Sequence, residues 1–449
     1  MGVSLSREQV LALAPDAASA KAAIGLATER HWLTVGADEG AAWGECKGSG
    51  AKPYQTQVDL AALATKCSCP SRKFPCKHGL ALLLIYTQRA PFPPSDRPLW
   101  VDEWLSTRRD KVAKKELAAT ERSPADQATA DAAASKREAT RWKRIEAGSS
   151  DLQRWIADQF RRGLGQFGHE QRAEWSAMAA RTVDAQMPGL GSQLLEARAA
   201  LEAGSAGHEE AIERLGLIQL ANAGIARRGQ LSPARLADLR IALGWPQDKE
   251  DVAVSADAVD DDWIVLGQIV IARDKGVSER RIWLRGSTSG RDALLLDFAF
   301  RGKNWGDVWL DGMSYRALLN FYPGSVPLRA LVTSQSAASS QALPQQSPEE
   351  AVDLASQRFA ENPWQQQLPL LLSDATPVRH GQQWCLHTGV GVFPLLVSNA
   401  SAWSLLAFCG GKPVHLMGEW DGRTLRPLSA FDATQTRHRW CLDALEVEA

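Results

Sequence analysis

The sequence has little of what marks a secreted, membrane-spanning or strongly charged protein. Its longest apolar run, LALLLIY at 80–86, is far shorter than the roughly 20 residues that a membrane-spanning helix needs. The first residues, MGVSLSREQV, lack the basic and then apolar pattern of a signal peptide. The formal net charge of −1 gives no global attraction to nucleic acid or to a membrane surface. We therefore expect a cytoplasmic protein with no membrane partner.

Cysteine is also scarce, with seven residues in a chain of 449. An odd number without a secretion signal argues against a framework of disulfide bonds. Three of the seven nevertheless fall within one short stretch, KCSCPSRKFPCKH at 66–78. This local concentration of thiols needs a chemical explanation.

Common catalytic motifs are missing. The chain has neither the Gly-x4-Gly-Lys-Ser/Thr loop that binds ATP phosphates nor a His-Glu-x-x-His pair. GLGQFG at 163–168 matches the glycine pattern of dinucleotide sites, but a helical segment precedes it, so we expect a turn between helices. Cys385 and His387 repeat a Cys-x-His spacing, which alternation along a strand explains better than a second metal. We expect no catalytic residues and no enzyme activity.

The cysteine-rich stretch has the donors of a metal site. Cys67 and Cys69 are two residues apart, so their side chains project to the same side of an extended segment, and Cys76 and His78 repeat that spacing. Three thiolates and an imidazole fill the tetrahedral shell of zinc and leave no position for water, which is typical of a structural site. We predict that Cys67, Cys69, Cys76 and His78 bind one structural Zn²⁺. The alternatives are reduced core thiols or redox-active thiols, but the complete ligand set favours metal.

The segments that flank the stretch predict a small fold around it. YQTQVDL at 54–60 alternates as a half-buried strand should, and AAWGECKGSG at 41–50 is typical of a partner strand that enters a turn. Downstream, KHGLALLLIYTQ at 77–88 predicts a helix that carries His78 at its start. We expect a hairpin, then a knuckle with Cys67 and Cys69, then the helix. Cys46 falls in the first strand, and we interpret it as an ordinary strand cysteine.

The pattern Cys-x-Cys, six residues, Cys-x-His between two strands and an apolar helix resembles the SWIM zinc finger, over about residues 40–90. The family's signature is Cys-x-Cys, a variable gap and Cys-x-His, and all four positions match. The resemblance implies a module that contacts DNA or other proteins. It also implies, for long bacterial members, partnership with a MoxR-type AAA+ ATPase and a von Willebrand A-domain protein.

The finger region is basic although the chain is neutral. Between residues 46 and 94 there are seven cations and one acid, Asp59. Four of the cations lie on or beside the metal loop and are candidate phosphate contacts: Lys66, Arg72, Lys73 and Lys77. The alternative is a solvated face that offsets the thiolate charge, since no aromatic ladder or recognition helix accompanies the cations.

The remaining sequence predicts an α+β multi-domain protein with a small ββα zinc finger, an all-helical middle domain and a β-rich C-terminal region. We place an N-terminal domain with the finger at 1–95, a proline break and charged alanine-rich helix or linker at 96–150, a helical domain at 151–250, and a tryptophan-containing β domain at 260–449. An acidic link is expected at 246–263, and strand-like segments include WSLLAFCGG at 403–411. The β domain could be two related units divided by the Ser/Gln/Ala-rich stretch at 333–351, since WLDG at 309–312 resembles EWDG at 419–422.

These observations favour a non-enzymatic adaptor that presents a zinc finger to protein partners, with an AAA+ ATPase system as the partner that the resemblance implies. The alternative is a nucleic-acid-binding protein that uses the basic finger.

Overall fold

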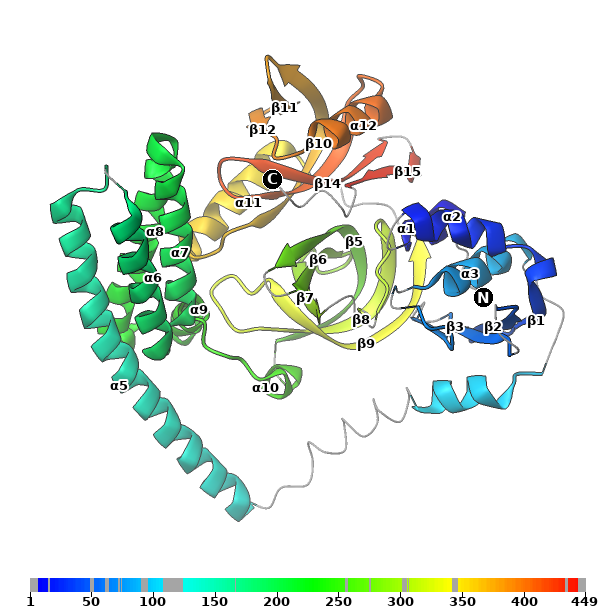
Figure 1. The fold of residues 1–449 in the computed structure, drawn as a ribbon, viewed down its shortest axis with the longest axis horizontal. Coiled ribbons are helices and arrows are strands. Elements are labelled where there is room, and N and C mark those ends of the chain that lie inside the picture. The colour runs from blue at the N-terminus through cyan, green and yellow to red at the C-terminus, as the bar shows by residue number, and fades with distance from the viewer. Residues whose placement is uncertain are drawn as a thin grey trace.

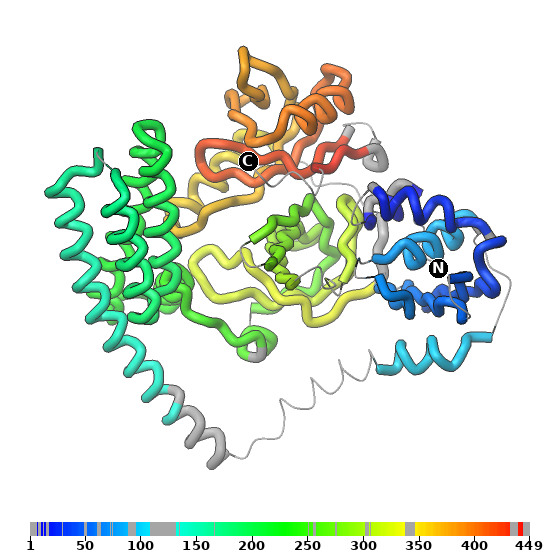
Figure 2. The backbone as a smooth tube through the Cα atoms, viewed as in Figure 1, coloured from blue at the N-terminus to red at the C-terminus, as the bar shows by residue number. Residues whose placement is uncertain are grey.

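The computed structural model shows four regions: a finger domain, a helical bundle, a closed barrel and an open C-terminal sheet (Figure 1). It describes residues 7–14, 17–48, 52–60, 64–71, 73, 75–89, 96–107, 124–165, 167–254, 257–273, 276–300, 305, 307–340, 346–432 and 435–442. The barrel lies centrally, with the finger domain and the bundle at opposite ends of the molecule and the C-terminal sheet against one side, as the chain path in Figure 2 also shows.

The finger domain is a four-stranded antiparallel sheet covered by helices. Its strands are β1 (Trp32–Ala37), β2 (Ala41–Cys46), β3 (Tyr54–Asp59) and β4 (Ala64–Cys67), paired in sequence order. Helices α1 (Arg7–Ala12) and α2 (Ala17–Leu26) pack on α3 (Lys77–Arg89), which itself lies on the sheet. The predicted hairpin is therefore the centre of a larger sheet, and the apolar helix after it is confirmed.

Both faces of the finger sheet are covered. On the face away from α3, Ala41 and Trp43 pack against Val101 and Leu105, which belong to a helical segment at 99–107. On the α3 side, the buried residues Leu80 to Tyr86 belong to an apolar cluster that continues into the barrel. The finger is thus joined to the rest of the protein by a shared core.

The middle of the chain is a bundle of α5 (Pro124–Arg162), α6 (His169–Asp184), α7 (Pro188–Glu202), α8 (His208–Ala226) and α9 (Pro233–Leu243). Trp175 is fully buried at its centre and meets Trp155 edge-on, with ring centroids 5.1 Å apart. Helix α5 runs without a break across residue 150, where the sequence analysis placed the start of the helical domain. The GLGQFG segment joins α5 to α6, and Gly163 takes a φ of +81°, so the predicted helix–helix turn is confirmed.

The barrel is built from β5 (Ala258–Arg273), β6 (Val277–Gly286), β7 (Asp292–Phe300), β8 (Met313–Phe321) and β9 (Arg329–Ser340), in the closed order β5-β6-β7-β9-β8. All pairs are antiparallel except β7–β9, which gives the Greek-key arrangement of an OB-type barrel. Its interior is filled by fully buried side chains, among them Trp263, Tyr315 and Phe321.

Two predicted connections are structured instead. The acidic link at 246–263 contains α10 (Lys249–Ala253) and the start of β5. The acids at the start of β5 have partners in the barrel. Arg316 of the neighbouring strand pairs with Asp260, and the backbone N–H groups of Thr288 and Ser289 donate to the carboxylate of Asp261. Strand β9 extends into the Ser/Gln/Ala-rich stretch and pairs with β8 as far as Ser340.

The C-terminal region is a six-stranded open sheet with two helices. It comprises α11 (Pro348–Glu361), β10 (Leu368–His380), β11 (Gln383–Thr388), β12 (Gly391–Pro394), α12 (Asn399–Cys409), β13 (Val414–Trp420), β14 (Leu425–Asp432) and β15 (Gln435–Cys441). Its order, β12-β11-β10-β13-β14-β15, differs from that of the closed barrel, so the barrel and the sheet are not two copies of one unit. The strand expected at WSLLAFCGG is helix α12, because Ser398 caps its start and Gly410, at φ +57°, ends it.

The C-terminal sheet packs on the outer face of the barrel. Ile269 and Ile271 of β5 and Trp283 of β6 share a core with Met417 of β13, and the Trp283 indole donates to Glu419 at 2.9 Å. In OB-folds the outer face of the second and third strands is the usual site for oligonucleotides. Here much of that face, at β6, is occupied by the protein's own sheet.

Helix α9 fastens the bundle to the barrel. The carboxylate of Asp238, which is buried, accepts hydrogen bonds from the Ser325 backbone and from the side-chain amide of Asn362, both at 3.1 Å. Burial raises the pKa of Asp238 above its ordinary value. Within the described residues, no helix combines the length and the apolar character that a membrane crossing requires.

Candidate metal centre

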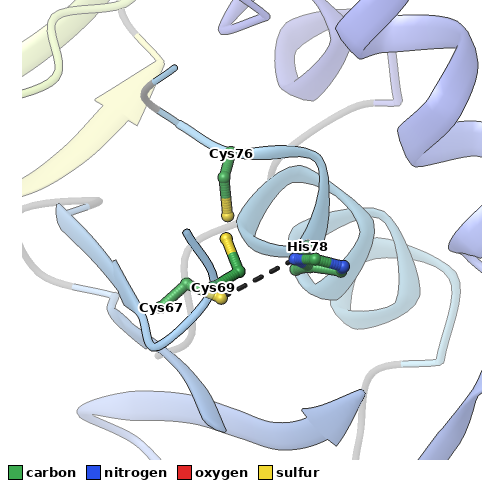
Figure 3. A group of neighbouring side chains, drawn as sticks. All are labelled: Cys67, Cys69, Cys76 and His78. Carbon is green, nitrogen blue, oxygen red and sulfur yellow. Dashed lines mark hydrogen bonds between the residues drawn. The ribbon is translucent and has the colours of Figure 1, made fainter. Parts of the chain in front are cut away.

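The four predicted ligands come together at the junction between β4 and α3. Cys67 is the last residue of β4 and Cys69 follows it, whereas Cys76 immediately precedes α3 and His78 is the second residue of that helix. Figure 3 shows the three sulfurs and one edge of the imidazole directed toward a common point. The hairpin-side pair and the helix-side pair thus meet as the sequence predicted.

The distances fit a tetrahedral ion. One donor atom from each of the four residues lies within 4.8 Å of all the others, and Cys67 Sγ is 3.8 Å from His78 Nδ1. Zinc bonds of about 2.3 Å to sulfur and about 2.0 Å to nitrogen would place neighbouring ligand atoms roughly 3.5 to 3.8 Å apart. All seven cysteines are free thiols, so no disulfide competes for these sulfurs. The cluster fits one structural zinc ion.

Local hydrogen bonds hold the sulfurs in place. Thr56 Oγ1 lies 3.1 Å from Cys67 Sγ across the β3–β4 pair. The backbone N–H of Gly79 donates to Cys76 Sγ at 3.5 Å, which is the geometry of a helix N-cap. Cys76 is therefore both a metal ligand and the residue that caps α3, and the positive end of the helix dipole faces the sulfur cluster.

Two further residues let the helix approach the sheet. A Cβ atom at Gly79 would lie 3.3 Å from the Thr65 side chain, so a glycine here permits close contact between α3 and β4. The Tyr54 ring packs on the His78 ring, with centroids 5.0 Å apart. The spacing of the ligands does not mark Thr56 or Tyr54 as site residues, whereas the glycine directly after the Cys-x-His pair is a usable signal for Gly79.

The thiol electrostatics also point to a cation. Hydrogen bonding from Cys76, with smaller contributions from His78 and Thr56, lowers the pKa of Cys67. The same hydrogen bond, followed by burial and by the charge on Cys67, raises the pKa of Cys76. Burial raises the pKa of Cys69 as well. Without metal the three sulfurs compete for one negative charge, and a divalent cation would let all three ionise. Their crowding is explained by a shared ion.

Cys46 is not part of the cluster. It is fully buried in β2, and its thiol donates to the Lys47 carbonyl at 3.8 Å. Burial raises its pKa to about 11. It is a strand cysteine, as interpreted from the sequence. Cys385 and His387 lie on β11, and within the described part of the chain the Cys67 cluster is the one group of three or more metal-ligating residues.

The candidate phosphate contacts surround the metal loop. Lys66 on β4, Lys73 in the loop and Lys77 at the first position of α3 are all exposed, and each is close in sequence to a ligand. Arg72 lies outside the described residues. The cations are thus positioned on the surface beside the cluster.

Comparison with known proteins assigns two parts of the chain. Residues 54–86 match the family model of the SWIM zinc finger, and residues 140–243 match that of the SWIM-associated four-helix bundle domain. No curated protein and no solved structure matches the chain. The first match contains all four ligands, and the second spans the helices from the second half of α5 to α9. The chain therefore carries a SWIM zinc finger, with Cys67, Cys69, Cys76 and His78 as its metal cluster, together with a SWIM-associated helical bundle.

Proposed function

We propose that this protein is a non-enzymatic adaptor in which structural zinc shapes a finger that binds protein partners. The observation that carries this proposal is the closed ligand set: three sulfurs and one imidazole leave no coordination position for a substrate or a water. The ion would therefore stabilise the finger and take no part in a reaction.

The rest of the described structure gives little support for catalysis. The barrel interior is filled by large side chains, and a pocket of about 220 Å³ lies between the barrel and α11. Three of the four charged residues that line that pocket are paired, since Arg358 binds Asp292 at 2.7 Å and Arg291 binds Asp257 at 2.7 Å. An enzyme site would offer convergent titratable groups that are free to meet a substrate.

The shared core suits a scaffold. The finger is continuous with the barrel, and the barrel supports both the C-terminal sheet and the bundle, so a partner bound at the finger would be held in a defined position relative to the other regions. The resemblance to SWIM proteins supports a MoxR-type AAA+ ATPase and a von Willebrand A-domain protein as partners. A reducing cytoplasm would suit the seven free thiols.

The test measures binding of the purified full chain to a MoxR-type ATPase and a von Willebrand A-domain protein from the same host. We expect binding by the wild type and by Cys409→Ala, which removes a buried cysteine far from the cluster in sequence, and loss of binding in Cys69→Ala. Equal binding by Cys69→Ala and wild type, or no binding by the wild type, would argue against the finger as the partner site.

The alternative function is nucleic-acid binding by the finger. The exposure of Lys66, Lys73 and Lys77 beside the cluster favours it. A double variant, Lys66→Gln with Lys77→Gln, keeps all four ligands and should weaken binding to DNA or RNA if these lysines contact phosphates. Absence of binding by the wild type at low salt would eliminate this alternative.

A further inference from the structure

Helix α5 extends well beyond the bundle that it belongs to. Its 39 residues span about 58 Å at 1.5 Å per residue. Figure 1 shows α5 along the outer edge of the bundle, with its N-terminal half running past the ends of α6, α7 and α8. Its packing is on the inner side, where Trp142 and Ile145 are buried. On the opposite side, residues 136, 137, 140, 143 and 144 are exposed.

That outer side carries four exposed cations. Lys136 and Arg137 form one basic pair, and Lys143 and Arg144 form a second pair seven residues later. Because seven residues make nearly two turns, the pairs lie on the same side of the helix, about 10 Å apart along its axis. None of the four forms an ion pair within the part of the chain that the structure describes. We refer to these four residues as the α5 basic face.

The acids on this stretch are neutralised from the other side. Glu138 pairs with Arg240 of α9 and accepts a hydrogen bond from the Trp142 indole at 3.3 Å. Glu146 pairs with Arg228, which follows α8. A further cation, Arg141, stacks on Trp245 with its guanidinium carbon 4.2 Å from the ring centroid. The bundle thus supplies partners for both carboxylates, and no acid among the described residues pairs with the α5 basic face.

We propose that the α5 basic face binds the phosphate backbone of duplex nucleic acid. Duplex DNA presents one negative charge per roughly 1.7 Å of its axis, so the distance of about 10 Å between the basic pairs spans about six phosphates. A helix with two pairs of cations about 10 Å apart on one side can contact several phosphates along one side of a duplex. The contact would be independent of base sequence, because phosphates carry no sequence information.

The composition of the face disfavours the other polyanions. Thr140, which lies between the two pairs, and the exposed Ala133 and Ala147, which flank them on this side, offer no large apolar group to insert into a lipid bilayer, as an amphipathic membrane helix requires. An acidic peptide would be expected to anchor an apolar side chain as well as charges. The α5 basic face provides charge alone, which is what a backbone contact needs.

The face is distinct from the finger. The bundle and the finger domain lie at opposite ends of the molecule (Figure 1), so binding at α5 and binding at Lys66 and Lys77 can be separated by mutation. The proposal therefore stands or falls independently of the adaptor function and of its nucleic-acid alternative.

The experiment measures fluorescence anisotropy of a labelled duplex of roughly 20 base pairs with the zinc-loaded full chain, at about 50 and about 200 mM salt. Each phosphate contact contributes about 0.9 to the slope of log K against log salt, so four contacts predict a fall in affinity of about 150-fold over this range. The double variant Lys143→Gln with Arg144→Gln should reduce the slope by about 1.8, and neutralising all four cations should abolish binding.

The matched control lies on the same helix. Arg154→Gln with Arg161→Gln removes the same charge from exposed positions, but these arginines already pair with Asp151 and Asp158. We expect the control to bind with nearly the wild-type slope, and circular dichroism should show unchanged helix content in every variant.

Four outcomes would overturn the proposal. These are no binding by the wild type at low salt, an unchanged slope when all four cations are neutralised, an equal loss in the Arg154/Arg161 control, and a loss caused by Lys66→Gln with Lys77→Gln alone. Equal affinity for a single strand or for vesicles containing phosphatidylserine would contradict the assignment to a duplex.

Discussion

Substitutions at Cys76 can separate the contribution of metal binding to stability from that of helix capping, because this residue has both roles. Its sulfur belongs to the metal cluster, and the same sulfur accepts the Gly79 N–H as the N-cap of α3. Replacing it with serine keeps a short polar side chain that can cap the helix but removes a soft thiolate ligand. Replacing it with alanine removes both. The two substitutions therefore share the loss of metal and differ in the cap.

The magnitudes follow from these two roles. Structural zinc sites contribute about 10–16 kcal/mol of apparent binding free energy, and this stabilises the folded finger. An N-cap contributes about 1 kcal/mol. Both variants should thus lose zinc, and the backbone amides of α3 should lose most of their protection from hydrogen exchange. Cys76→Ala should be about 1 kcal/mol less stable than Cys76→Ser. Cys46→Ser, which changes a cysteine of the same domain outside the cluster, should retain zinc.

Hydrogen exchange read by mass spectrometry measures this directly, together with the zinc content of each variant. We expect fast exchange in residues 77–89 for both Cys76 variants and slow exchange for the wild type, with the strands of the C-terminal sheet protected in all three. Slow exchange throughout α3 in the zinc-free Cys76→Ala protein would show that the helix folds on its packing alone and does not depend on the ion.

Three further predictions concern the regions that support the finger. Because burial raises the pKa of Asp238, its protonated carboxyl contributes stability at low pH that is lost as pH rises through the folded-state pKa. In thermal melts between about pH 4 and 7, the melting temperature of Asp238→Asn should therefore rise relative to that of the wild type as pH increases. A difference in melting temperature that does not change with pH would contradict this. Trp283→Phe removes the N–H that binds buried Glu419 and should lower the free energy of unfolding, measured with urea, by about 2 kcal/mol. An unchanged free energy of unfolding would show that the carboxylate finds another partner. Gly189→Ala would place a Cβ 2.2 Å from the backbone of α9 and should lower the free energy of unfolding by about 1–3 kcal/mol. Gly216→Ala on α8 adds a methyl group that meets nothing within 4 Å, so it should raise the free energy of unfolding by about 0.5–1 kcal/mol. Equal effects of the two substitutions would argue against the described helix packing.

The metal cluster was predictable because its information is local. Two Cys-x-Cys/His pairs six residues apart, next to an alternating strand and an apolar helix, define the ligands without reference to the rest of the chain. What the sequence did not reveal is the support around them. Strand β4 is only four residues long, and Thr56 is placed beside Cys67 by the register of β3 with β4.

For the rest of the chain, the sequence predicts the type of secondary structure in each region but not how its elements are arranged. The helical middle and the strand-rich end follow from their periodicity. The closure of the barrel instead depends on the pairing of β5 with β8, whose partner residues run from Ile264 with Ser314, 50 positions apart, to Ala258 with Asn320, 62 positions apart. The segment WSLLAFCGG is apolar on all sides and so has no helical period, and its helix α12 is set by the caps Ser398 and Gly410. Asp260 and Asp262 resembled a solvated linker because their partner, Arg316, is distant in sequence.

The structure of the finger depends on one zinc ion held by Cys67, Cys69, Cys76 and His78. Its presence can be measured by elemental analysis combined with X-ray absorption at the zinc edge, on protein purified without chelator. We predict one zinc per chain with three sulfur neighbours at about 2.3 Å and one nitrogen at about 2.0 Å. A chain without stoichiometric zinc, or a metal shell dominated by oxygen, would show that these four residues do not form a structural zinc site.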